Sequence, residues 1–324
     1  MHRLHPQTLA TLALVFNALV WGLSWWPFRL LDERGLHPLW ASCLISAFCG
    51  LVVLTLGRGR LVPARSHRTG LIMLAASCGL TNAAFNWGIT VGEVVRVVLL
   101  FYLMPVWSLL AARWLLDERI DLRGALQILL ALGGAAMMLL KPGVADGSLG
   151  AAGGRPDELG NWLGSLGDWL GLCGGIAFAI TNVLLRRHRD APPSSRAMAM
   201  FAGGAIVPAL IALQNLSPVA QWPSTPGNWI IPFTALALAF LAANLALQFG
   251  AARLPARLTA LVMLSELVFA VGSAVWIGDE TLSASTLLGA CLILAATLWG
   301  LREVRRSSDA DDALETFEKK GVDP

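Results

Sequence analysis

A single carboxyl group lies deep within a long apolar stretch near the C-terminal end of the chain. Glu266 is near the middle of the stretch 258–277. A charge at the centre of a bilayer costs about 2.5–3.5 kcal/mol on insertion scales, so it calls for an explanation. Such a carboxyl group can take up a proton or pair with a cationic group of a solute. The alternative is a protonated carboxyl that hydrogen-bonds a neighbouring helix.

Glu93 and Arg96 form a second charged group, three residues apart and therefore on one face of a helix. The planar fork of Arg96 matches a carboxylate, and Glu93 can receive an ammonium group. Asn86 and Trp87 lie just before them in the sequence. Together these four residues predict a mouth of the pathway that binds a zwitterionic solute. The alternative is an interfacial ion pair whose side chains reach water.

Aromatic side chains provide two further candidates. Trp21 and Trp25 recur along one stripe of the first apolar stretch, and Trp21 is the better placed to form an aromatic wall in a cavity. Tryptophan also anchors helices at membrane interfaces, which is the alternative. Tyr102 is the only tyrosine, and it lies near the middle of a span, where its hydroxyl can donate to a ligand.

Side-chain amides occur at matching positions in the two halves of the chain. Asn82 and Asn86 share one helix face, and Asn244 and Gln248 share the corresponding face in the second half. The four amides either line a pathway from both sides or make hydrogen bonds between helices.

The elements that position these residues are membrane helices. The chain has 324 residues, of which 56% are hydrophobic and 14% are charged, an apolar excess that a soluble domain does not carry. About 20 apolar residues in a helix cross the hydrocarbon core of a bilayer. Stretches of this kind recur at 9–28, 38–56, 70–88, 94–114, 122–140, 168–185, 197–214, 229–249, 258–277 and 283–301. We therefore predict an all-α membrane protein of ten transmembrane helices.

The basic residues indicate how these helices are oriented. If the N-terminus is cytoplasmic, all of the 24 Lys and Arg residues fall on the inner side except Arg29, Arg34, Arg96, Lys141 and Arg155. Positive residues concentrate in cytoplasmic loops. Both termini are therefore predicted to be cytoplasmic.

The chain repeats itself at a constant shift of 162 residues. TNAAFNWG at 81–88 superposes on ANLALQFG at 243–250, and Asp117-Glu118 meets Asp279-Glu280. These two acidic turns are expected to cap the helices that follow them. Five helices in each half place the halves in opposite senses, which predicts an inverted repeat of the kind found in secondary transporters. The predicted parts are a first repeat at 1–141, an external Gly-rich linker at 142–167, a second repeat at 168–301 and a cytoplasmic tail at 302–324.

Three segments together resemble a known family. ALVWGLSWWPFR in the first span, LFYLMPVWSLLAARWLLDER in the fourth and MLSELVFAVGSAVWIGDE in the ninth are similar to the EamA family of the drug/metabolite transporter superfamily. The resemblance covers about 9–301. It implies a ten-helix secondary transporter, an exporter that moves a small organic metabolite by alternating access through a central cavity.

Other classes of protein fit less well. All five histidines lie in predicted loops or termini, and no GxxxxGK[ST] or HExxH motif occurs, so we expect neither an enzyme nor a cofactor or metal site. The formal charge of +3 gives no reason to expect nucleic acid. The expected partners are a small-molecule substrate, the lipid bilayer of a bacterial inner (plasma) membrane, and protons if transport is coupled. A passive channel or a non-transporting scaffold is the alternative function.

Overall fold

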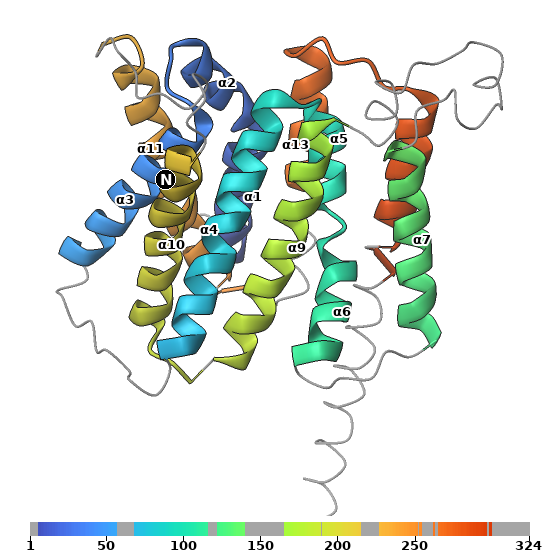
Figure 1. The fold of residues 1–324 in the computed structure, drawn as a ribbon, viewed down its shortest axis with the longest axis horizontal. Coiled ribbons are helices and arrows are strands. Elements are labelled where there is room, and N and C mark those ends of the chain that lie inside the picture. The colour runs from blue at the N-terminus through green and yellow to red at the C-terminus, as the bar shows by residue number, and fades with distance from the viewer. Residues whose placement is uncertain are drawn as a thin grey trace, which may run out of the picture.

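The computed structural model describes residues 6–56, 68–115, 122–139, 165–188, 190–214, 227–251, 253–254, 262, 265–296 and 298–299. Within these ranges the secondary structure is helical, without strands, and the helices gather into one bundle (Figure 1). The helices are α1 (Pro6–Leu23), α2 (Trp25–Glu33), α3 (Pro38–Leu56), α4 (Arg68–Val91), α5 (Val94–Phe101), α6 (Met104–Leu115), α7 (Leu122–Leu139), α9 (Leu166–Arg187), α10 (Pro193–Gln214), α11 (Ile230–Ala251) and α13 (Ser265–Trp276). An apolar helix at Ala284–Ala296 follows them.

The lengths and composition of these helices confirm a membrane protein. Six stretches are long and apolar enough to cross a membrane: Thr8–Glu33, Pro38–Thr55, Val94–Ala111, Leu166–Arg187, Ser194–Gln214 and Ile230–Leu247. Gly124–Met137, Ser265–Trp276 and Ala284–Ala296 are shorter apolar helices. The total of ten spans stays a prediction. The tail 302–324, the linker as far as residue 164 and the turn Asp117-Glu118 lie outside the described residues.

Charged residues of the described helices gather at two ends of the bundle. We call the upper end in Figure 1, where α2 and α4 finish and α5 and α9 begin, the acidic end. It carries Arg29, Arg34 and Arg96 and the acids Asp32, Glu33, Glu93, Asp168, Asp279 and Glu280. The opposite end, which we call the basic end, carries Arg68, Arg113, Arg186, Arg187 and Arg196. These five basic residues therefore lie at one end of the bundle.

Two predicted spans are not continuous helices. The fourth is interrupted at Tyr102 and Leu103, between α5 and α6. Pro105 has no N–H to donate to a carbonyl of the preceding turn, which explains the break. The first span is likewise interrupted at Ser24, between α1 and α2, and Pro27 follows in the first turn of α2. At each break the backbone still makes a tight turn, because Ser24 N donates to the Trp21 carbonyl oxygen and Leu103 N donates to that of Leu100.

The two halves of the chain interlock. α1 packs against α11 and α13, α9 packs against α4, α5 and α6, and α3 packs against α10. Glycines allow these close approaches. A Cβ added at Gly22 on α1 would lie 2.7 Å from the Cβ of Phe269 on α13, and one added at Gly79 on α4 would meet the carbonyl oxygen of Gly203 on α10. Small residues bring membrane helices together in this way.

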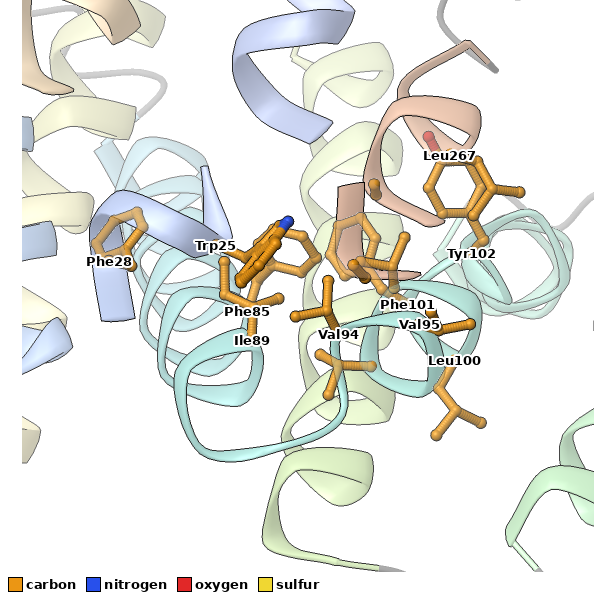
Figure 2. Packing of buried hydrophobic residues seen from close by; sticks show 14 of the residues in the cluster. Trp25, Phe28, Phe85, Ile89, Val94, Val95, Leu100, Phe101, Tyr102 and Leu267 are labelled. Atoms are coloured by element: carbon orange, nitrogen blue, oxygen red, sulfur yellow. The ribbon is translucent and has the colours of Figure 1, made fainter. Parts of the chain in front are cut away.

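A buried apolar cluster occupies the junction of α2, α4, α5 and α13 (Figure 2). Its largest members include Trp25, Phe28, Phe85, Phe101 and Tyr102. The cluster fixes the break between α5 and α6 beside α13.

Two adjacent glycines of α7 give a matched test of the packing against the helix at Ala284–Ala296. A Cβ at Gly134 would lie 2.7 Å from the carbonyl oxygen of Gly289, whereas one at Gly133 meets nothing within 4 Å. Gly134→Ala is therefore expected to destabilise the protein by about 1–3 kcal/mol, the usual cost of overpacking. Gly133→Ala should be neutral or stabilising, since alanine favours a helix by about 1 kcal/mol. Thermal unfolding of both variants in detergent measures the difference, and equal melting temperatures would contradict the packing.

Candidate functional site

Glu266 lies where the second half of the chain meets α1. It is in the first turn of α13, and a Cβ at Gly22 of α1 would lie 2.8 Å from its carbonyl oxygen. The residue is partly buried, and part of its surface stays accessible. Glu266 is therefore neither shielded completely nor exposed to the outside of the bundle.

Tyr102 reaches this place from the first half. It lies at the break between α5 and α6, and its side chain is buried next to α13, beside Leu267, the residue that follows Glu266 (Figure 2). The structure thus brings together two predicted candidates that are far apart in the sequence.

Trp21 and Trp25 have different surroundings. The ring of Trp21 is partly buried and meets the edge of Phe240 on α11, with centroids 4.5 Å apart. Trp25 is buried, and its indole Nε1 donates to Ser273 Oγ of α13 at 2.9 Å. Trp25 therefore links α2 to α13, whereas the ring of Trp21 contacts α11.

Arg96 has a different principal partner from the one the sequence suggested. Its Nε donates to Oδ1 of Asp168 at 3.1 Å and its Nη2 donates to Oδ2 of Asp168 at 2.8 Å. Glu93 approaches Arg96 only to 3.9 Å, and its side chain is 67% exposed. In this conformation the guanidinium fork already holds a carboxylate, so Arg96 and Glu93 do not form the predicted open mouth for a zwitterion.

Asp168 is a residue whose importance the sequence reasoning missed. It lies in the first turn of α9, where its Oδ2 accepts from the backbone N–H of Ser165 and its own N–H donates to Ser165 Oγ. This reciprocal arrangement is a capping box. The spacing Ser165-x-x-Asp168 before an apolar run was the signal that could have identified it.

Glu280 caps a helix, but not the one that follows it. Its Oε1 accepts from Val94 N at 2.8 Å and its Oε2 from Val95 N at 3.1 Å, so it caps α5 of the first half. Arg29 completes the group with a contact of 3.3 Å to Glu280 Oε1. The following helix is capped instead by Ser283, whose Oγ accepts from Thr286 N. The expectation from sequence was wrong here, because a turn cannot show which helix folds back against it.

One of the predicted amides links two helices, and two others bond within their own helix. Asn86 donates to Ser42 Oγ of α3 at 2.8 Å, which is the helix-to-helix bond proposed as an alternative. Asn82 donates to the Cys78 carbonyl of its own helix, and Asn244 likewise to Phe240. The side chain of Gln248 is outside the described residues.

Trp87 faces away from Arg96. Its ring packs edge to face against His37, with centroids 5.6 Å apart, in a small apolar cluster with Leu39 and Ala212. His37 lies between the first two spans, and burial lowers its pKa to about 4. It is therefore neutral at physiological pH.

The fold and these contacts define a helical membrane protein with a carboxyl group set between its two halves. A family model for the EamA-like transporter family matches the chain twice, over residues 8–140 and 165–301. The chain therefore belongs to the EamA-like transporter family. Membership of this family makes it a membrane transporter of the drug/metabolite transporter superfamily.

Two further comparisons complete the picture. No functionally curated protein matches the chain. A solved structure described only as "Crystal structure of protein" aligns over 92% of this chain and 98% of its own, with a TM-score of 0.53 and 18% sequence identity. At that identity the likeness concerns the fold alone.

Proposed function

We propose that the protein is a secondary transporter that exports a small amphipathic organic solute by alternating access. The pathway would run through a central cavity between two inverted halves, with Glu266 controlling occupancy. The observation that supports this proposal is the position of Glu266, partly accessible in the first turn of α13, a helix that packs against α1 and contacts α5. A carboxyl group among apolar helices costs free energy, and its presence there points to a functional role.

The packing of the halves supports the inverted arrangement. α1, the first helix of the first half, packs against α11 and α13 of the second. α9, the first helix of the second half, packs against α4, α5 and α6 of the first. The contacts of one half are thus repeated by the other with the roles exchanged, as a twofold relation in the membrane plane produces.

The surroundings of Glu266 favour a particular kind of solute. The rings of Trp21 and Phe240 contact each other and belong to the same apolar cluster as Tyr102 and as Leu267, the residue that follows Glu266. Aromatic faces and a carboxylate together attract a cation with an apolar body. The proposed solute is therefore an amphipathic molecule with an amine, and a proton competes with it for Glu266.

The orientation follows from the charges. We propose that the basic end faces the cytoplasm of a bacterial cell, with both termini on that side, because positive residues are retained there. The acidic end then faces outward, and export delivers the solute at that end.

The proposal is tested by finding a solute and following its flux. Purified protein is screened by thermal shift against amino acids, nucleosides and cationic drugs, because a ligand that binds the folded state raises the melting temperature. Uptake of a radiolabelled hit into proteoliposomes is then expected to saturate with concentration and to show counterflow. Flux that rises linearly with concentration, without counterflow, would instead indicate a passive channel, and protein-free liposomes provide the background.

A further inference from the structure

Two charge clusters join the halves at the acidic end, and they lie in different parts of the bundle. Arg96 and Asp168 connect α5 with α9. These two helices approach closely along their length: a Cβ at Gly171 would lie 2.7 Å from the carbonyl oxygen of Val97, and one at Gly175 would lie 2.7 Å from that of Phe101. The Arg96–Asp168 pair is therefore inside one continuous packed unit.

Glu280 stands between two packed units. α13, just before it, packs chiefly against α1, which also packs against α11. Glycines tighten this second unit, since a Cβ at Gly250 of α11 would lie 2.8 Å from the carbonyl oxygen of Ala10 on α1. The contact of α13 with α5 is smaller than its contact with α1. Glu280 reaches across that smaller contact to the start of α5.

The start of α5 depends on this contribution from the other half. The N-cap residue of α5 is Glu93, whose side chain makes no capping hydrogen bond. Glu280 supplies the acceptors instead, to the N–H groups of Val94 and Val95. Arg29 adds its contact with Glu280 and also donates to the carbonyl oxygen of Gly92 at 2.6 Å. Charge-assisted bonds of this kind are among the strongest in proteins.

We propose that Glu280 is a movable cap that closes the acidic end of the pathway, and that this end opens when α13 withdraws Glu280 from α5. The inference rests on the proposed alternating access and adds the residues that hold one of its states. The Arg96–Asp168 pair stays intact in both states. Water takes the place of Glu280 at the two N–H groups in the open state.

A buried reporter thiol near the cap tests this proposal. Val95 is 3% exposed in the closed end. Val95→Cys is placed in a background in which the five native cysteines are replaced by alanine or serine, and its labelling by a maleimide is timed in detergent. Adding Glu280→Ala is expected to raise the labelling rate about tenfold or more. The reason is that the loss of even one charge-assisted hydrogen bond shifts the equilibrium between the closed and the open end by about that factor. Glu280→Gln should lie between Glu280→Ala and the parent.

Two controls separate opening from other effects. Glu93→Ala removes a neighbouring carboxylate that makes no capping hydrogen bond, so it should not accelerate labelling. A second reporter that retains only native Cys49, 2% exposed on α3, should stay slow. Equal rates with and without Glu280, or acceleration at both reporters through unfolding, would overturn the proposal.

The labelling result is independent of solute transport. If Glu280→Ala accelerates labelling but no solute shows saturable flux, the movable cap stands and the proposed function fails. If flux saturates but labelling does not change, the transporter stands and the cap is static.

Discussion

Asp168→Ala is expected to lower the free energy of unfolding by about 3–5 kcal/mol, because it leaves the Arg96 guanidinium inside the protein without its carboxylate. The side chain of Asp168 is 1% exposed and that of Arg96 is 15% exposed. The same substitution removes the capping box of α9, which adds about 1 kcal/mol. Thermal unfolding in detergent should show a melting temperature several degrees lower.

The neighbouring carboxylate provides the matched control for this prediction. Glu93→Ala removes the other acid that approaches Arg96, but that pair is 3.9 Å long and Glu93 is 67% exposed. Exposed pairs contribute about 0–1 kcal/mol, so the melting temperature should hardly change. The double variant Arg96→Met with Asp168→Leu should recover part of the loss, since no charge is then buried. Similar losses for Asp168→Ala and Glu93→Ala would contradict the assignment of the principal partner.

The second large effect is expected at Glu266. Glu266→Gln should weaken the binding of a cationic solute by about ten- to a hundredfold, because a hydrogen bond to a charged group contributes about 1.5–3 kcal/mol. Flux in proteoliposomes should also lose its dependence on pH, since a carboxyl group can be neutralised by a proton and an amide cannot. Concentration series at several pH values measure both changes.

Two comparisons make this test specific. Glu266→Asp keeps the charge and should retain pH-dependent flux, whereas Glu33→Gln makes the same chemical change at an exposed position of the acidic end and should behave as the parent. His37, with its pKa lowered to about 4 by burial, stays neutral across the pH range used. Unchanged flux and an unchanged pH profile in Glu266→Gln would remove this residue from the mechanism.

The sequence located the central carboxyl group because Glu266 violates a local pattern. A charged residue within an apolar stretch is visible without any knowledge of its neighbours, and the cost of inserting it points to a purpose. Helical class, membrane location and family follow for the same reason, since they depend on the composition and repetition of segments about 20 residues long.

Pairing across the bundle could not be predicted in this way. The sequence placed Glu93 with Arg96 because they are three residues apart, yet Asp168, 72 positions away, takes the guanidinium. Glu280 caps a helix 186 positions before it. No local rule connects such residues, because their distance is set by how α9 and α13 pack against α5.

The sequence by itself determined that this chain forms apolar helices, that its two halves repeat, and that one acid stands within a long apolar stretch. Each of these properties is a sum over neighbouring residues, so the order of amino acids is sufficient to state it. Only the tertiary structure decided which charges meet. Several carboxylates could bind the same guanidinium or the same helix N-terminus. The one that does so is the one that packing brings within hydrogen-bond distance.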